Sequence, residues 1–203
     1  MIQANPAQHD TTDAGAPGAL SQRDRSIRAL CWRLIGRPAF VCTPRTAYKA
    51  RRWLLERFGA TLAPSVKFRK TCSIDRPWNL TAGALTMFGD DTIVRATAPI
   101  SIGIRCVISQ YTILTSTRLE RAEAGFRSVS EPIEIGDDCW IATDCVVLPG
   151  ARTPDGVVVG ARSLVTGGLD AWTIATGEPA KSRKARPRLT PEQPAHGEEP
   201  ADA

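Results

Sequence analysis

Histidine is nearly absent from this sequence of 203 residues. Its two histidines, His9 and His196, stand close to the two ends of the chain. Residues 10–195 therefore offer no imidazole, the side chain that most often binds zinc and that serves as a base near neutral pH. A zinc enzyme with histidine ligands shared between subunits is excluded on this ground, and we expect no metal cofactor.

The sequence also lacks a long apolar segment. No run approaches the roughly 20 apolar residues that a helix needs to span a bilayer. The first residues do not combine a basic start with an apolar stretch, as a secretory signal would. We therefore expect a cytoplasmic protein, with attachment to the inner face of the membrane as an alternative.

Apolar residues are scarce at both ends of the chain. Residues 1–22 and 187–203 are small, polar and interrupted by proline and glycine. Such segments bury too little apolar surface to offset the entropy cost of ordering the chain. We predict two disordered tails, with one folded domain and its appendages between them.

The middle of the chain contains a large apolar residue at nearly every sixth position. These residues are Leu62, Phe68, Ile74, Leu80, Phe88, Val94, Ile102, Ile108, Leu114, Ile135, Ile141, Val147, Val159 and Val165. A fixed repeat of six is typical of a β-helix built from hexapeptide repeats. The sequence therefore predicts an all-β fold, a parallel β-helix of about five coils over residues 61–170.

The repeat breaks once, over residues 115–132. This stretch, TSTRLERAEAGFRSVSEP, is too polar and too charged to form another coil. We interpret it as an excursion loop that leaves the β-helix after Leu114. Because loops that extend from rigid scaffolds often carry functional residues, this loop is a candidate part of the active site.

Residues 23–60 precede the coils and are predicted to form a helical cap. One helix is expected over residues 24–40, ended by Pro38, and a second over residues 45–58, with Gly59 after it. These helices can cover the open edge of the first coil. Residues 1–57 hold ten basic residues against four acidic ones, so peripheral contact with an anionic membrane is the alternative.

Four of the six cysteines share one position in the repeat. Cys72, Cys106, Cys139 and Cys145 each follow a hexad residue by four positions, where other repeats have threonine, serine or alanine. That position normally takes a small, inward-pointing side chain at a corner of the coil. We interpret the four cysteines as buried, reduced thiols that pack as small apolar groups.

Several segments resemble a known family. They are RRWLLERFGA (51–60), PWNLTAG (77–83), ISQYTIL (108–114), VVGARSLVT (158–166) and WTIATGEPAK (172–181). Together they are similar to the hexapeptide-repeat acyltransferases, and in particular to the colanic-acid-type exopolysaccharide biosynthesis acetyltransferases. The resemblance extends from residue 32 to residue 186 and so covers most of the chain.

The resemblance implies a left-handed parallel β-helix that assembles as a homotrimer. It implies acetyl-CoA as the acyl donor and a sugar or polysaccharide precursor as the acceptor, in a groove between neighbouring subunits. Carried over by position, Thr143, Ala161 and Thr166 would contact the pantetheine arm. No nucleic-acid partner is expected.

Residues 171–186 follow the last coil and would bind the phosphates of CoA. The resemblance places Lys181 and Lys184 there, with Arg183 beside them, and cations close together suit a diphosphate and a further phosphate. A solvated basic segment is the alternative. Asn79 stands where the family faces the acceptor, although an asparagine that ties a turn between coils is also consistent with its position.

The catalytic position departs from the family. Relatives carry a histidine base in the excursion loop, followed by an acid, and alignment on ISQY places this pair at Leu119 and Glu120. A general base contributes about 10²–10⁴ in rate to such a transfer. Glu120 is the nearest substitute, but a carboxylate with an ordinary pKa of about 4.3 is a weak base unless burial raises that pKa.

Two functions of different classes follow from these observations. The first is an acetyl-CoA-dependent O-acetyltransferase for a sugar or exopolysaccharide precursor, weakened by the loss of histidine at Leu119 or using another base. The second is a catalytically inactive hexapeptide-repeat protein that binds CoA or pairs with an active relative.

Overall fold

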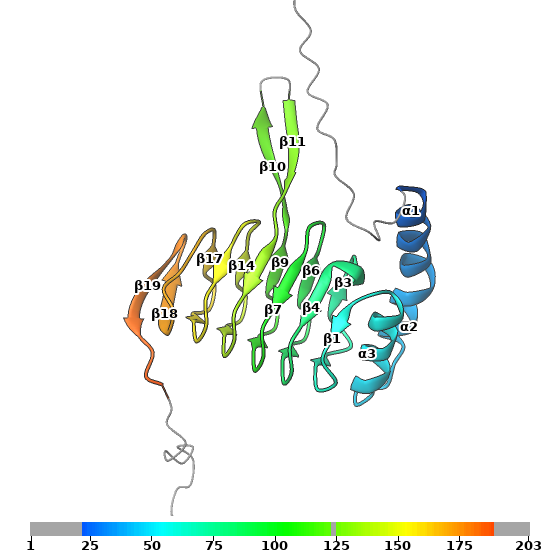
Figure 1. Ribbon diagram of the computed structural model, residues 1–203, viewed down its shortest axis with the longest axis horizontal. Coiled ribbons are helices and arrows are strands. Elements are labelled where there is room, and N and C mark those ends of the chain that lie inside the picture. Colours follow the sequence, from blue (N-terminus) through cyan, green and yellow to red (C-terminus); the bar gives the residue numbers. More distant parts are fainter. Residues whose placement is uncertain (1–21, 123–124, 189–203) are drawn as a thin grey trace, which may run out of the picture.

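The computed structural model describes residues 22–122 and 125–188 (Figure 1). Most of the two tails predicted to be disordered lies outside these residues. The main body is a parallel β-helix in which each coil contributes one short strand to each of three sheets. The predicted all-β fold and its parallel coils are confirmed.

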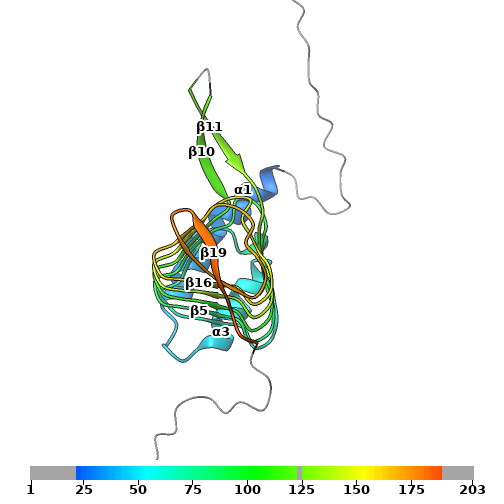
Figure 2. The ribbon, with the colours of Figure 1, turned by 90° about the vertical axis from the view of Figure 1, so that its left-hand side faces the viewer.

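The three sheets form the sides of a prism, which Figure 2 shows from its carboxyl-terminal end. Sheet one contains β1 (Thr61–Leu62), β4 (Leu80–Ala82), β7 (Ile100–Ile102), β12 (Ile133–Ile135) and β15 (Arg152–Thr153). Sheet two contains β2 (Lys67–Phe68), β5 (Met87–Phe88), β8 (Val107–Ile108), β13 (Trp140–Ile141), β16 (Val158–Val159), β18 (Thr173–Gly177) and β19 (Ala180–Ala185). Sheet three contains β3 (Ser73–Ile74), β6 (Ile93–Arg95), β9 (Ile113–Thr115), β14 (Val146–Val147) and β17 (Leu164–Val165).

The coil count is slightly higher than predicted. Five coils contribute a strand to all three sheets, and β18 begins a sixth turn by pairing in parallel with β16. The strand β19 then pairs antiparallel to β18 and closes that end of sheet two. The sixth turn lacks the hexad spacing, which is why the repeat alone did not reveal it.

The register between coils explains the hexad. In sheet two, Phe68 lies opposite Phe88, and Phe88 lies opposite Ile108, so hexad residues stack in a column inside the prism. The rings of Phe68 and Phe88 stack with their centroids 4.5 Å apart. The predicted hexad residues are buried, except that Leu62 of the first coil is partly exposed. Burial of this apolar column provides most of the driving force for folding.

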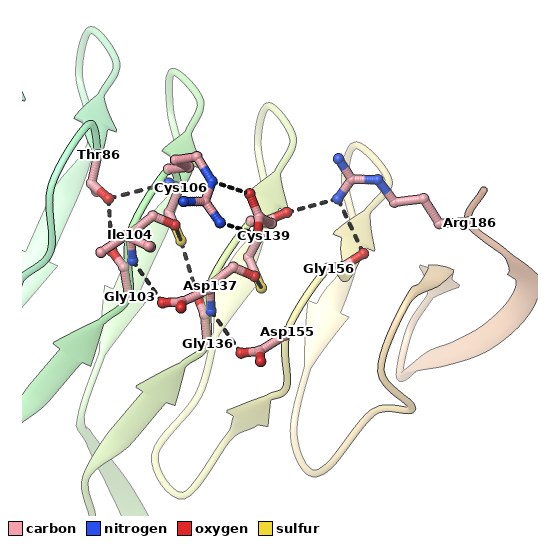
Figure 3. A network of polar contacts seen from close by, with 12 residues as sticks. Thr86, Gly103, Ile104, Cys106, Gly136, Asp137, Cys139, Asp155, Gly156 and Arg186 are labelled. Atoms are coloured by element: carbon pink, nitrogen blue, oxygen red, sulfur yellow. Dashed lines mark hydrogen bonds and ion pairs between the residues drawn. The ribbon is translucent and has the colours of Figure 1, made fainter. Parts of the chain in front are cut away.

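The four repeat-position cysteines are buried, as the sequence predicts. Three of their sulfur atoms also donate hydrogen bonds to the following coil: Cys106 Sγ lies 3.0 Å from the carbonyl oxygen of Gly136, Cys139 Sγ lies 3.1 Å from that of Pro154, and Cys145 Sγ lies 3.2 Å from that of Gly160 (Figure 3 shows the first two cysteines). Thr86 uses its hydroxyl in the same way. At these corners a small donor therefore joins each coil to the next.

Aspartates add a second set of links at the corner between sheets one and two. Asp137 accepts a hydrogen bond of 2.8 Å from the backbone of Ile104, and its own backbone N–H donates one of 2.8 Å to Asp155 (Figure 3). Asp138 forms an ion pair with Arg105 at 2.6 Å. The arginine holds the pKa of Asp138 below its usual range, so this carboxylate is charged at neutral pH.

The excursion predicted as a loop is a β-hairpin. Its strands, β10 (Thr117–Ala122) and β11 (Gly125–Ser130), pair antiparallel and project from the corner between sheets three and one (Figures 1 and 2). At its base, the buried hydroxyl of Ser116 accepts a hydrogen bond of 2.8 Å from the backbone of Ala98. The hairpin therefore starts from a fixed point on the rigid prism.

The amino-terminal segment forms the predicted helical cap. It consists of α1 (Gln22–Cys31), the π-helical turn η1 (Trp32–Gly36), α2 (Arg37–Val41) and α3 (Tyr48–Arg57). The prediction that Pro38 ends the first helix was wrong. In η1 the backbone N–H of Arg37 bonds to the carbonyl of Trp32, five residues back, and Pro38 then starts α2, where a proline is tolerated. Within the described residues, no helix is long and apolar enough to cross a membrane.

Two buried side chains join the cap to the coils. The indole of Trp32 donates a hydrogen bond of 2.8 Å to the carbonyl of Ile74. Arg51 is fully buried, and its Nε donates to the carbonyl of Phe68 at 2.8 Å. The same guanidinium donates to Thr43, Pro44 and Arg45 of the loop before α3. Arg51 thus ties the first coil, α3 and this loop together.

Replacement of Arg51 by methionine tests this connection. Because it leaves several buried carbonyl groups without a donor, we expect the free energy of unfolding to fall by about 3 kcal/mol or more. Lys49→Met is the matched control, since Lys49 is exposed on the same helix, and it should change stability by no more than about 0.5 kcal/mol. Urea unfolding followed by circular dichroism measures both, and equal effects would contradict the proposed role of Arg51.

Candidate functional site

Two of the predicted pantetheine residues stack at one corner of the prism. Thr143 lies between β13 and β14, and Ala161 lies one coil further on, between β16 and β17. The backbone N–H of Arg162 donates to the carbonyl of Thr143 at 3.0 Å, and the Thr143 hydroxyl donates to the carbonyl of Gln110 at 3.0 Å. We call this edge between sheets two and three the 143–161 corner.

Thr166 and Asn79 lie at the next corner, where the chain passes from sheet three to sheet one. Thr166 follows β17 directly and is exposed. Asn79 ends the short helix η2 (Pro77–Asn79), and its amide donates to the carbonyls of Ala96 at 2.7 Å and Thr97 at 3.0 Å. The Asn79 amide therefore ties two consecutive coils together at this corner. The hairpin projects from this same edge, which we call the hairpin corner.

The strand β19 carries the three predicted phosphate-binding cations. Lys181 pairs with Thr176 near the end of β18, and the backbone of Gly177 there donates to Ser163 beside Ala161 at 3.1 Å. Lys181 therefore lies near the 143–161 corner. Lys184 pairs with Ile174 instead, three residues along the strand, which is roughly 10 Å away. A register shift after Ile174 leaves Arg183 between them.

These three cations are free of ion pairs among the residues that the structure describes. Lys181, Arg183 and Lys184 are all exposed, and none lies within salt-bridge distance of a described carboxylate. Arg186 behaves differently, because its guanidinium donates to the carbonyls of Asp138 at 2.7 Å and Gly156 at 3.1 Å (Figure 3). The first three are thus available for an anionic partner, whereas Arg186 fastens the segment after β19 to the coils.

The carboxylate of Glu120 is held between two arginines on the hairpin. One of its oxygens accepts from Arg118 at 2.7 Å, and the other accepts from Arg127 on the neighbouring strand at 3.2 Å. Arg118 also forms an ion pair with Glu131 at 3.1 Å. These hydrogen bonds from Arg118 and Arg127 lower the pKa of Glu120. Glu120 is therefore an even weaker base than an ordinary glutamate.

Leu119 and Glu120 point to opposite faces of the hairpin. They are consecutive residues of β10, and consecutive side chains of a strand alternate between its faces. Leu119 is 72% exposed, so its position could hold a side chain that reaches another molecule. A carboxylate at position 120 cannot occupy the space that a side chain at position 119 occupies.

Sequence reasoning missed the cluster formed by Arg118, Glu120, Arg127 and Glu131. A weak signal was present, because Leu119 stands between the charged residues Arg118 and Glu120 and glycine follows at position 125, as in many hairpins. Neither described segment, 22–122 or 125–188, contains a histidine, and no group of three His, Cys, Asp or Glu in them could hold a metal ion.

Comparison with known proteins identifies the family. No model of a protein family matches the chain. The chain is, however, 37% identical over 155 residues to the protein of Escherichia coli (strain K12) named putative colanic acid biosynthesis acetyltransferase WcaF. The matched region covers 76% of this chain and 85% of that protein. The chain belongs to this acetyltransferase family. The WcaF of Shigella flexneri matches equally well, and the resemblance noted in the sequence is confirmed.

Solved structures agree with this membership at the level of the fold. A maltose O-acetyltransferase from Clostridium difficile 630 superposes with a TM-score of 0.72, at 22% identity, over 83% of this chain and 90% of its own. The hexapeptide-repeat acetyltransferase VCA0836 of Vibrio cholerae, solved with acetyl coenzyme A, gives a TM-score of 0.71 at 21% identity, over 83% and 91% of the two chains. The β-helix of the family is thus the fold of this chain.

The charge state of Glu120 can be measured directly. We expect a carbon-detected NMR titration to place its pKa below the ordinary value, since both arginines favour the charged form. The stabilising Arg118–Glu120 interaction is then present above the unfolded-state pKa and is lost as pH falls through the lower folded-state pKa. Arg127→Gln should raise the Glu120 pKa, while Arg121→Gln on the same strand serves as the control. A Glu120 pKa above the ordinary value in the native protein would contradict this assignment.

Proposed function

We propose that this protein transfers the acetyl group of acetyl-CoA to a hydroxyl group of a sugar or exopolysaccharide precursor. Its membership of an acetyltransferase family over most of the β-helix carries the proposal. The names of similar proteins support both substrates. WcaF is named for colanic acid biosynthesis and the Clostridium enzyme for maltose, which suit a saccharide acceptor, and the Vibrio protein was solved with acetyl coenzyme A, the proposed donor. In the reaction, the hydroxyl oxygen attacks the thioester carbonyl, the C–S bond breaks, and CoA leaves as a thiol that carries the hydroxyl proton.

We place the donor along the 143–161 corner. An extended pantetheine arm can follow the exposed backbone of consecutive coils past Thr143 and Ala161, with Thr166 on the far side of sheet three. The phosphates would then meet Lys181 first, with Arg183 and Lys184 along β19. The free state of these cations supports the proposal, because an unpaired cation does not have to give up a carboxylate before it binds phosphate.

We further propose that the site is completed by a second subunit of a homotrimer. A corner of a prism is convex, so the 143–161 corner provides only one wall of a groove. A neighbouring copy of the chain must supply the other wall and would bring its own hairpin or sheet face to the donor. In this arrangement the acceptor lies near a hairpin corner, where Asn79 is fixed by Ala96 and Thr97.

We propose that Glu120 positions the hairpin and is not the catalytic base. Its two oxygens are engaged by Arg118 and Arg127, and its low pKa gives it little tendency to accept a proton. Acyl transfer would then depend on holding both reactants in line, a contribution that needs no base. The same observation favours a second candidate, a protein that binds CoA and does not turn it over.

Removal of the β19 cations tests the donor site. We expect Lys181→Ala/Lys184→Ala to weaken CoA binding by at least about tenfold, since each charge-assisted phosphate contact contributes roughly 1 kcal/mol or more. Binding of pantetheine, which lacks the phosphates, should hardly change. Lys67→Ala/Lys70→Ala removes two exposed lysines from the first coil and is the matched control. Isothermal titration calorimetry measures all three proteins, and unchanged CoA affinity in the β19 variant would refute the site.

Restoring an imidazole tests the missing base. We expect Leu119→His to raise acceptor-dependent kcat by about 10²–10⁴, with a rise through pH of about 6.5 that the unmodified protein lacks. Leu119→Asn, polar but not basic, should not do so, and Glu120→Gln should change kcat by less than about threefold. Thiol release from acetyl-CoA with maltose and other saccharides measures the rate. Loss of turnover in Glu120→Gln alone would assign the base to Glu120, whereas CoA binding without turnover in every variant would favour the inactive candidate.

A further inference from the structure

The helical cap has a second apolar stripe, on the side away from the coils. Along α1, η1 and α2, the inward side chains Trp32 and Phe40 are buried against the β-helix. The outward stripe contains Ile27, Leu30, Leu34, Ile35 and Val41, whose side chains are 51–65% exposed. Leu30 and Leu34 are one helical turn apart, so the apolar surface is continuous. A soluble surface helix normally has a polar outer face, and this one does not.

Basic residues surround this stripe. Residues 26–57 contain eight basic residues and a single acid, Glu56, which pairs with Arg52. Arg33 and Arg37 flank the stripe from the same helix and are exposed, Arg37 with one hydrogen bond of 3.1 Å to the Ser73 hydroxyl. An apolar stripe with cations at its margins is typical of a helix that lies in the interface of a membrane.

We propose that the outer face of the cap docks on the surface of an anionic bilayer. Leu30, Leu34 and their apolar neighbours would enter the boundary between headgroups and acyl chains, and Arg33 and Arg37 would meet lipid phosphates. Charge favours this partner over a second copy of the chain, because two caps placed face to face would bring the exposed Arg33 and Arg37 of one copy close to those of the other. The inference does not depend on acyl transfer.

The geometry of the prism makes this docking compatible with the candidate site. The cap lies at one end of the β-helix and β19 lies at the other end (Figure 1). The hairpin leaves after the third coil, which is roughly 10 Å from the first at about 4.8 Å per coil. A protein docked by its cap would therefore hold the hairpin corner close to the lipid surface and its β19 end in the aqueous phase.

Vesicle flotation of the full-length protein tests the proposal. We expect it to float with vesicles of phosphatidylcholine and phosphatidylglycerol at about 0.1 M salt, and to bind much less at about 1 M salt, where the Debye length falls to roughly 3 Å. Vesicles of phosphatidylcholine alone should bind it at least about tenfold more weakly. Absence of flotation with the anionic vesicles at the lower salt concentration would overturn the proposal.

Three variants separate the stripe from general surface effects. Leu30→Gln/Leu34→Gln and Arg33→Gln/Arg37→Gln should each lower the vesicle partition coefficient by about tenfold or more, and glutamine preserves helix propensity. The control is Arg121→Gln/Phe126→Ser, which removes one exposed apolar and one basic side chain from opposite positions on the hairpin. Circular dichroism confirms that each variant is folded. An equal loss of binding in the control variant would contradict the assignment to the cap.

Sedimentation of the lipid-free protein identifies the alternative occupant. If Leu30→Gln/Leu34→Gln lowers the oligomeric state in solution, a second copy of the chain covers the stripe and the membrane proposal is wrong. An unchanged sedimentation coefficient, together with lost vesicle binding, supports docking on lipid. Because these readouts involve no acetyl transfer, their failure leaves the proposed function untouched.

Discussion

Stacking of one coil on the next, in fixed register, is the constraint on which the rest of the molecule depends. Backbone groups of each coil bond to the coil that follows, as from Met87 to Cys106 and from Val107 to Cys139, both at 2.9 Å. A position that points inward in one coil must therefore point inward in all of them. Apolar residues therefore have to recur at a fixed spacing to fill the inward positions. At the corners, the inward positions take small hydrogen-bond donors such as Thr86. The hexad and the cysteine positions are consequences of the same register.

The same register generates the candidate site. Side chains outside the prism cannot form a pocket in a single coil, but positions at one corner align along the axis, as Thr143 and Ala161 do. Among the described residues, the regular coils are interrupted by the hairpin and end at the β18–β19 pair. At both places the strands leave the parallel pattern and pair antiparallel. The hairpin and the cations of β19 thus lie where the repeat is interrupted, beside the regular corner that carries Thr143 and Ala161.

The sequence predicted the repeating parts well because each inward residue is determined by spacing alone. It could not predict features that depend on a contact between two particular residues far apart in the sequence or on different strands. That Arg51 is buried while Lys49 is exposed depends on where α3 meets Phe68. The low pKa of Glu120 depends on Arg127, seven residues away, which lies opposite it only because of the hairpin register. Lys181 and Lys184 are close in sequence, yet the extended strand β19 separates them, and the register shift decides which residues of β18 they lie opposite.

Each end of the prism has an open coil that must be covered, and different elements cover the two ends. An open coil exposes apolar side chains and unpaired strand edges, which invite association with other chains. At the first coil, helices cover both, held by buried Trp32 and Arg51. At the last coil, β19 is an edge strand, and its exposed lysines oppose pairing with another strand, because a basic edge has to be desolvated before it can dock. Cations that are free of described carboxylates suit both roles, so protection of the edge and the donor site that we propose would call for the same residues.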